Sequence, residues 1–505
     1  KTARRPGARA RASLWLIIFG LALGGSPTEL LAGEDPGPGL RLAPCPFDDG
    51  DGLLCGVLEV FEDRQRQSGR KIPLNVVLMP SRSPEPRGTG SGGEGETGSK
   101  ALFVLAGGPG VAATDWGRRF VNGALDGVRA TRDVVLVDQR GTGGSNGLRC
   151  PLYEGDSPSS LWGDLLPVEP IERCRRALEE RADLRFYGSA FAADDLDDVR
   201  AALGYAQIDL YGSSYGSHLA QVYMRRHPDR VRSAVLQGVA PVDARSLEEI
   251  PHAAQAALDG LVSRCAADPA CRSAYPRFEQ QLAAVFDRLR ADAVQVPWTA
   301  PGNDEPDVLT LTYDHFALVL RGLLHHPAAA ATIPRIVDAA AGGDFGPFVA
   351  PSLTYRRALA DGIAFGLFLS VFCEEQVRSA DLEAADAAAE ASFAGEYWTE
   401  QLVRACAAWP RGILPAGHDQ PLRSAAPTLL ISGGLDPATP PHWARSVAVN
   451  LPKSRLLVFP HASHSLGGLV GCVDELVVDF LDRGSAHGLD ASCIDDLEPP
   501  PFLLP

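Results

Sequence analysis

The chain has 505 residues, of which 45% are hydrophobic, and its formal net charge at pH 7 is −16. A chain of this length can bury more than one minimal core, so we expect two structural units or one domain with a large insertion. Such an acidic protein repels nucleic acid and anionic membranes, which argues against polynucleotide binding.

The first 33 residues are typical of an export signal. The basic run at residues 1–11 contains no acid, residues 14–23 are almost wholly apolar, and small or turn-forming residues follow. This order predicts a secretory signal peptide, because the apolar run is only about half the roughly 20 residues that a spanning helix needs. An uncleaved membrane anchor is the alternative, since no clean Ala-x-Ala cleavage site is visible. We expect a secreted or periplasmic protein without stable membrane insertion once the signal is cleaved.

The ten cysteines form an even set of close sequential couples. They include no Cys-x-x-Cys motif and no zinc-type histidine pattern, and export favours disulfide formation. We therefore expect five local bridges between consecutive cysteines, with buried free thiols as the alternative. In chain order the cysteines are Cys45, Cys55, Cys150, Cys174, Cys265, Cys271, Cys373, Cys406, Cys472 and Cys493.

After the signal, residues 34–242 alternate between strand and helix patterns. Residues 53–61 and 72–79 are expected to form an opening hairpin, and residues 80–100 a flexible surface loop. Short apolar strands then alternate with amphipathic helices, which predicts a mostly parallel sheet flanked by helices on both faces. These strands are expected at residues 101–106, 133–137, 208–211 and 233–239, and the helices at residues 192–203 and 217–226.

The alternation stops at residue 243, and residues 243–412 are alanine-rich and helical in pattern. Strand signals resume at residues 428–432 and 455–459, followed by a helix at residues 470–481. This order predicts an α/β core in two parts, residues 34–242 and 413–505, with an inserted, mainly helical cap formed by residues 243–412.

The segment Gly212-Ser213-Ser214-Tyr215-Gly216 has the form G-x-S-x-G and stands between a predicted strand and a predicted helix. Glycines on both sides permit the sharp, strained turn that presents a nucleophile. The following helix N-terminus favours negative charge on the Ser214 oxygen. The motif alone is common by chance, but its context makes Ser214 the candidate nucleophile of an α/β-hydrolase fold. Ser213 is a rival only by adjacency.

A serine nucleophile needs a base, and the base needs an acid that orients it. In this fold both follow the serine in chain order, each in a loop after a strand. Asp436 follows the strand at residues 428–432 and is the candidate acid, with a helix N-cap as the alternative role. His464 follows the strand at residues 455–459 and is the candidate base, with His461 as the alternative.

Two backbone N–H groups are expected to stabilise the oxyanion of the tetrahedral intermediate. One belongs to Tyr215, the residue after the nucleophile. The other is expected in the turn after the strand at residues 101–106, where Pro109 has no N–H. We therefore choose Gly108 for the second donor and keep Gly107 as the alternative.

Three motifs together resemble those of the proline iminopeptidases and secreted tripeptidyl aminopeptidases. They are Ala-Gly-Gly-Pro-Gly at residues 106–110, Asp-Gln-Arg-Gly-Thr-Gly at residues 138–143, and the Ser214 motif. The segments around Asp436 and His464 match the same family, and the resemblance runs from about residue 40 to the C-terminus. Ala106 departs from the histidine that iminopeptidases commonly carry there, and Ser465 departs from a frequent glycine.

The resemblance implies an α/β-hydrolase serine exopeptidase, and the chain length, signal and cysteines favour the secreted tripeptidyl type. Such an enzyme must bind the cationic α-amino group of its substrate, for which a carboxylate is the physical solution. Glu374 and Glu375 are the candidates, because the resemblance supports an acid just after Cys373. A solvated pair of acids on a helix is the alternative.

We expect the protein to be an aminopeptidase that releases short peptides or single residues from free peptide N-termini through an acyl-enzyme. Peptides with a free N-terminus are the expected partners, and no cofactor or metal ion is expected. Three alternatives remain at this stage: an esterase or lipase with the same residues, a proline iminopeptidase, and a binding protein with an inactive hydrolase fold. The third is disfavoured because Ser214, Asp436 and His464 are all present.

Overall fold

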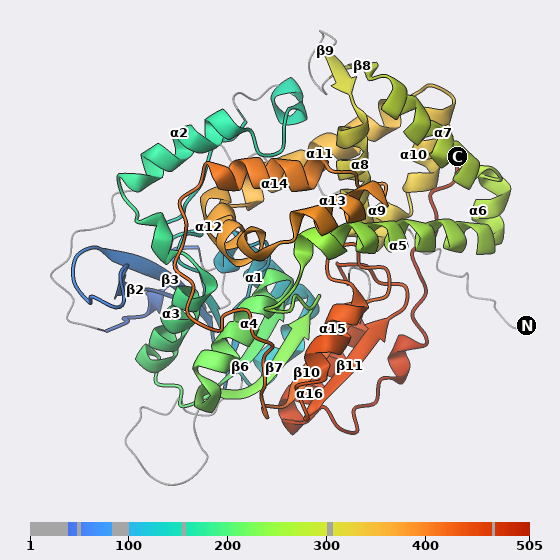
Figure 1. Cartoon of the computed structure of the whole chain (residues 1–505). Coiled ribbons are helices and arrows are strands. Elements are labelled where there is room, and N and C mark those ends of the chain that lie inside the picture. The colour runs from blue at the N-terminus through green and yellow to red at the C-terminus, as the bar shows by residue number, and fades with distance from the viewer. Residues whose placement is uncertain (1–38, 48–51, 83–99, 154–157, 300–306, 467–469) are drawn as a thin grey trace, which may run out of the picture. The chain divides into compact units, whose positions relative to one another are not determined.

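The computed structural model describes residues 39–47, 52–82, 100–153, 158–299, 307–466 and 470–505 (Figure 1). The predicted signal at residues 1–33 and most of the predicted loop at residues 80–100 lie outside the described residues. Leu40–Pro505 forms one compact unit. Within the described residues, no helix combines the length and the hydropathy that crossing a bilayer requires.

A nine-stranded sheet forms the base of this unit, in the order β1-β2-β3-β5-β4-β6-β7-β10-β11. The first three strands are antiparallel, and β3 also pairs antiparallel with β5, whereas all pairs from β5 to β11 are parallel. The strands are β1 Ala43–Pro44, β2 Leu54–Phe61, β3 Lys71–Met79, β4 Ala101–Leu105, β5 Asp133–Val137, β6 Ile208–Ser213, β7 Val231–Gln237, β10 Thr428–Gly433 and β11 Ser454–Phe459. The predicted opening hairpin and parallel strands are therefore present, with ends shifted by one or two residues.

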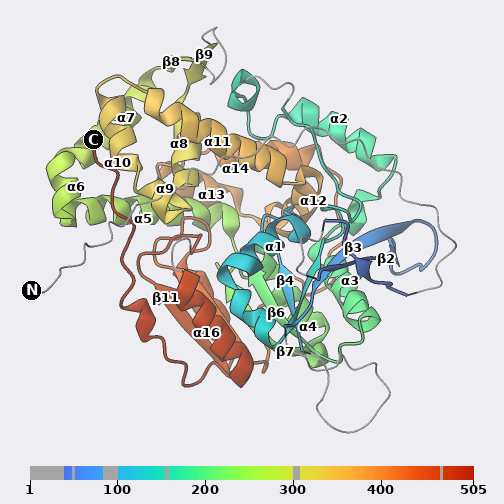
Figure 2. The same ribbon diagram turned by 180° about the vertical axis from the view of Figure 1, so that it is seen from behind.

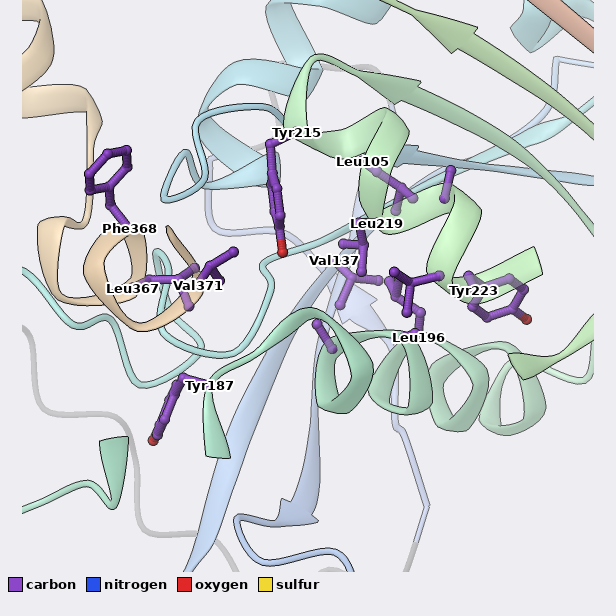
Figure 3. Packing of buried hydrophobic residues seen from close by; sticks show 14 of the residues in the cluster. Leu105, Val137, Tyr187, Leu196, Tyr215, Leu219, Tyr223, Leu367, Phe368 and Val371 are labelled. Carbon is purple, nitrogen blue, oxygen red and sulfur yellow. The ribbon is translucent and has the colours of Figure 1, made fainter. Parts of the chain in front are cut away.

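Helices cover both faces of the sheet, because successive side chains of a buried strand point to opposite sides. Leu102 and Val104 of β4 belong to a core shared with α1 and α16. Phe103 and Leu105 belong to a core on the other face, shared with α3, α4 and α15. Figure 3 shows part of this second core from close by. The bounds are α1 Ala113–Ala124, α3 Ser189–Ala202, α4 Tyr215–Arg226, α15 Pro441–Ala448 and α16 Val470–Arg483.

The cap is inserted in the chain between β7 and β10, which are neighbouring parallel strands of the sheet. It lies beyond the carboxyl ends of the parallel strands in both views (Figures 1 and 2). Its helices are α5 Ser246–Ala267, α6 Pro269–Ala274, α7 Phe278–Ala291, α8 Tyr313–Leu324, α9 Pro327–Ala330, α10 Ile333–Ala341, α11 Gly346–Gly362, α12 Phe365–Glu375, α13 Leu382–Glu390 and α14 Tyr397–Ala407. A small antiparallel ribbon, β8 Val294–Trp298 and β9 Asp307–Leu311, joins them.

A second segment, which precedes β6 in the chain, also packs on the cap. It contains α2 (Val168–Glu179), which contacts α12 and α14. The Leu165 N–H donates to the Tyr397 hydroxyl at 2.9 Å, and Arg356 Nε donates to the Leu161 carbonyl at 2.7 Å. The expectation that residues 243–412 alone build the cap is therefore incomplete.

Five disulfides join consecutive cysteines, as the sequence predicts. Each bridge is expected to stabilise the fold by about 2–4 kcal/mol, chiefly because it lowers the conformational entropy of the unfolded chain. The Cys373–Cys406 bridge connects α12 to α14 and so fixes the part of the cap that carries Glu375. The pairs are Cys45–Cys55, Cys150–Cys174, Cys265–Cys271, Cys373–Cys406 and Cys472–Cys493.

Helix α4 crosses the ends of β4 and β6 at very short range. A Cβ atom built on Gly216 would lie 2.1 Å from the Leu105 carbonyl oxygen, and one on Gly212 would lie 2.3 Å from the Gly216 carbonyl oxygen. Real Cβ atoms do not approach backbone this closely, so only glycine permits the helix to begin at this place.

Replacing Gly216 with alanine is expected to lower the free energy of unfolding by at least about 2 kcal/mol, because the added methyl group overlaps backbone. Gly471→Ala is the matched control. Gly471 lies in the first turn of α16, where a Cβ would meet nothing within 4 Å, so this variant should keep or slightly exceed the wild-type stability. Urea denaturation followed by circular dichroism measures both. Equal stability of the two variants would contradict the close packing of α4 on β4.

Candidate active site

Ser214 lies at the sharp turn between β6 and α4. Its backbone has φ 56° and ψ −125°, a conformation that costs a non-glycine residue about 1–3 kcal/mol. Backbone hydrogen bonds hold this turn: the Ser214 N–H donates to the Gln237 carbonyl at 2.9 Å, and the Ser217 N–H donates to the Ser214 carbonyl at 2.8 Å. Strain of this kind persists only where the surroundings enforce it, and it is typical of active sites.

The structure brings Ser214, His464 and Asp436 together from the ends of three strands. The His464 Nε2 atom lies 3.0 Å from the Ser214 hydroxyl oxygen, and the His464 Nδ1 atom lies 2.9 Å from Asp436 Oδ2. Both oxygens of Asp436 have further donors, namely the N–H groups of Ala438 and Thr439 at 2.8 Å and the Thr439 hydroxyl at 2.6 Å. These bonds fix the carboxylate, which in turn orients the imidazole.

His461, the alternative base, is exposed and does not line the cavity that contains Ser214. His325 of the cap comes much closer than the sequence suggests. Its ring lies 5.4 Å from the His464 ring, nearly perpendicular to it. The His325 Nδ1 atom is 2.8 Å from the Arg321 carbonyl, which acts as acceptor.

The pair of Asp436 and His464 is electrostatically coupled. Burial raises the pKa of Asp436, but His464 and the hydrogen bonds from Thr439 outweigh this effect and lower it below its usual value. Burial lowers the pKa of His464, but the Asp436 carboxylate outweighs this effect and raises it above its usual value. Burial, Arg321 and His464 lower the pKa of His325 to about 3, so His325 stays neutral at physiological pH.

Gly108 and Tyr215, the predicted oxyanion donors, line the same cavity as Ser214. Tyr215 is the first residue of α4, so its N–H belongs to the unsatisfied donors of the helix N-terminus. Gly107 also lies close, since a Cβ built on it would be 3.0 Å from the Ser214 Cβ. The arrangement places backbone of both segments beside Ser214, where a carbonyl oxygen attacked by the Ser214 hydroxyl would carry the developing charge.

The cavity lies between the sheet and the cap and has a volume of about 800 Å³. Most of its wall is apolar, with aromatic side chains from the core and from the cap, including Phe120, Tyr355, Phe368 and Trp398. Among the described lining residues, histidines aside, the charged side chains are one acid, Glu375, and one base, Arg321. A pocket of this size with few polar groups is typical of a small-ligand site.

Two family models match the chain in the expected order. The α/β hydrolase fold family matches residues 100–313, and the TAP-like protein family matches residues 391–493. The chain has the α/β-hydrolase fold, since the first of these matches agrees with the strand order of its sheet. It is a serine hydrolase, in agreement with its resemblance to a protein named as a serine protease.

Curated relatives of this hydrolase cover most of its length. The serine protease Hip1 of Mycobacterium tuberculosis H37Rv is 25% identical over an alignment of 499 residues, and the match covers 88% of this chain and 87% of the relative. The tripeptidyl aminopeptidase of Streptomyces lividans is 26% identical over an alignment of 479 residues, and the match covers 89% of this chain and 85% of the relative. The proline iminopeptidase of Neisseria gonorrhoeae is 29% identical over 138 residues, 27% of this chain and 32% of the relative.

Glu375 of the hydrolase is buried at the end of α12 and faces the cavity. Its carboxylate accepts hydrogen bonds from the Ser189 N–H and hydroxyl, both at 2.7 Å, and lies 3.0 Å from His218 Nε2 and 3.2 Å from His418 Nε2. Burial raises the pKa of Glu375, but the two histidines outweigh it and hold the pKa well below its usual value. Glu375 is therefore a carboxylate in the folded enzyme.

Glu374, the other predicted acid, is not among the described residues that line the cavity. Its carboxylate pairs with Arg378 and accepts the Gly412 N–H at 3.0 Å. The two neighbours point to different places because successive residues of a helix are about 100° apart. The structure therefore brings only Glu375 to the site.

Sequence reasoning missed the two histidines around Glu375. His218 lies in α4, four residues after Ser214, which precedes the first turn of this helix. Residues four apart share a helix face, so this spacing could have indicated that His218 lies near the site. His418 stands outside any helix or strand, and its position depends on tertiary structure alone. Ligand atoms of His218, Glu375 and His418 lie within 4.8 Å of one another, so among the described residues this cluster could hold a metal ion.

The pKa of His464 is expected to lie above the ordinary 6.5 in the wild-type hydrolase and below it in the Asp436→Asn variant. The reason is that burial and Arg321 both lower this pKa, and only the Asp436 carboxylate opposes them. NMR titration of the imidazole signals measures the change, with His464→Gln used to assign the resonance. A pKa that does not fall in Asp436→Asn would contradict the coupling.

Proposed function

We propose that this hydrolase is a serine aminopeptidase that releases short N-terminal pieces from peptides with a free α-amino group. The observation that carries the proposal is the buried carboxylate of Glu375 in the same cavity as Ser214 and His464. A fixed carboxylate that faces an apolar pocket can form a charge-assisted hydrogen bond to the α-ammonium group of a peptide. The names of the full-length relatives, a serine protease and a tripeptidyl aminopeptidase, support a peptide substrate.

Ser214, His464 and Asp436 are proposed as the catalytic triad. His464 takes the proton of the Ser214 hydroxyl as its oxygen attacks the scissile carbonyl, and the N–H groups of Gly108 and Tyr215 stabilise the oxyanion. The intermediate collapses to an acyl-enzyme, and His464 gives the proton to the leaving amine. A water molecule then attacks the ester, its proton passes through His464 to the Ser214 oxygen, and the N-terminal product leaves as a carboxylic acid.

Glu375 is proposed to receive the substrate α-ammonium group. Its hydrogen bonds with Ser189 and the neighbouring His218 hold the carboxylate in one place, so that little ordering is needed on binding. Ser189 also links Glu375 to the catalytic turn, because its hydroxyl lies 2.8 Å from the Tyr215 hydroxyl. The distance from Glu375 to Ser214 would then set how many residues are released.

We also propose that the enzyme works in an oxidising compartment outside the cytoplasm. The five disulfides support this, because such bridges persist in secreted and periplasmic proteins and are rare where thiols are kept reduced.

A peptide with a free N-terminus is expected to be cleaved at least about tenfold faster, in kcat/KM, than its N-acetylated twin, since acetylation removes the cation that pairs with Glu375. Mass spectrometry of both products measures the ratio and the length of the piece released. Ser214→Ala should abolish turnover and leave the circular dichroism spectrum unchanged. Equal cleavage of the twins would exclude the aminopeptidase function, and ester hydrolysis without peptide cleavage would favour an esterase.

Glu375→Gln is expected to lower kcat/KM for the free peptide by about tenfold to a hundredfold, because a hydrogen bond to a charged group is lost while the side-chain shape is kept. Glu374→Gln is the matched control, since Glu374 faces Arg378 and Gly412 instead of the cavity. Kinetics on the free and acetylated peptides measure both variants. An equal loss in the two variants, or a loss that also affects the acetylated peptide, would point to a structural role.

A further inference from the structure

Arg321 carries a positive charge on the cavity wall without a negative partner. It lies on α8, lines the cavity and is only 9% exposed. No described carboxylate forms an ion pair with it, and none contributes to its electrostatic environment. The contact that holds its guanidinium is the face of the Trp398 ring, with 5.4 Å between Arg321 Cζ and the ring centroid.

Three other buried arginines of the described chain have acceptors for their N–H groups. Arg140 forms two hydrogen bonds to the Asp195 carboxylate, at 2.6 and 2.7 Å. Arg132 pairs with Asp209 and Asp482, and Arg356 donates to the Leu161 and Gly163 carbonyls. Arg321 differs from these three, because no described residue accepts a hydrogen bond from its guanidinium, and an unpaired buried charge costs several kcal/mol. Burial lowers the pKa of its guanidinium, in agreement with that cost.

A second donor without an acceptor lies on the same wall. The indole Nε1 of Trp398 is buried and has no hydrogen-bond partner among the described residues. An unsatisfied buried N–H costs about 1–3 kcal/mol, so such groups are rare unless a ligand satisfies them. The Arg321 Cζ atom lies over the same ring, 5.4 Å from its centroid, so the two side chains are neighbours on this wall.

We propose, building on the aminopeptidase function above, that Arg321 and Trp398 form a subsite that binds a carboxylate group of the peptide substrate. A guanidinium offers paired N–H donors that match the two oxygens of a carboxylate, and the indole N–H supplies one more. The carboxylate comes either from the peptide C-terminus or from an acidic side chain.

The subsite complements the amine site chemically. Glu375 and Arg321 supply one negative and one positive group to a wall that is otherwise apolar or neutral, histidines aside, among the described residues. A peptide that presents an ammonium group to Glu375 and a carboxylate to Arg321 neutralises both at once. The enzyme then selects small zwitterionic peptides over internal segments of folded proteins.

Two matched peptide pairs test the subsite in the wild-type enzyme. The first pair is tetra-alanine with a free C-terminus and its C-terminal amide; the second is the amide with its third alanine replaced by glutamate or by glutamine. We expect the carboxylate-bearing member of one pair to have a kcat/KM at least about tenfold higher, and the pair that shows it identifies the source. Cleavage of all four at equal rates overturns the subsite and leaves the aminopeptidase intact. No cleavage of any peptide overturns the aminopeptidase itself.

Variants locate the effect. The ratio of kcat/KM for the carboxylate-bearing peptide to that for its neutral twin measures the preference. This ratio should fall toward one in Arg321→Met and should be partly kept in Arg321→Lys. It should also fall in Trp398→Phe, which retains an aromatic ring but lacks the N–H. The thermal midpoint of Arg321→Met should match or exceed that of the wild type, since an unpaired buried charge is removed. A full preference in Arg321→Met, or a fall in its midpoint, would overturn the assignment. If Arg321→Met does not fold, competition decides: N-acetyl-alanine must inhibit the wild type more strongly than its amide, and equal inhibition overturns the subsite.

Discussion

Helix α4 meets the ends of β4 and β6 so closely that the space between them admits only glycine at Gly212 and Gly216. This contact forces the chain to turn abruptly at Ser214, and it explains the unusual backbone angles there. The same turn aligns the first N–H groups of α4 beside the Ser214 hydroxyl. The backbone angles at Ser214 and the position of the α4 N-terminus beside its hydroxyl therefore follow from one packing constraint, and the strain is compensated by the cores on both faces of the sheet.

The cap forms part of the wall of the cavity that contains Ser214, and it contributes Glu375 and Arg321 to that wall. The pocket wall is mainly apolar, so the few charges on it interact more strongly than they would in bulk water. Glu375 is held by Ser189 and two histidines, whereas Arg321 has an aromatic face and no described counter-ion. The negative charge of Glu375 is thus fixed within a hydrogen-bonded cluster, whereas the positive charge of Arg321 is available to a ligand in the cavity.

The core, and the meeting of Ser214, Asp436 and His464 at one edge of its sheet, could be predicted from the sequence because the signals are local. Ser214, Asp436 and His464 each follow a short apolar run, and the carboxyl ends of parallel strands meet at one edge of a sheet. The sites contributed by the cap could not be predicted in this way. Arg321 reaches the cavity only through the packing of the cap helices, which their periodicity does not reveal. His418, outside the cap, comes to lie beside Glu375 only through tertiary structure. The pair Glu374 and Glu375 illustrates the limit, since the sequence selects the two acids and only the helix orientation separates them.

The loop that carries His464 is fastened to the cap. The Ser465 N–H donates to the His325 carbonyl at 2.8 Å, and the Ser463 hydroxyl donates to the Leu324 carbonyl at the end of α8. These two hydrogen bonds tie the position of His464 to that of the end of α8. If the cap lifted at α8, either these bonds would break or the imidazole would move away from Ser214.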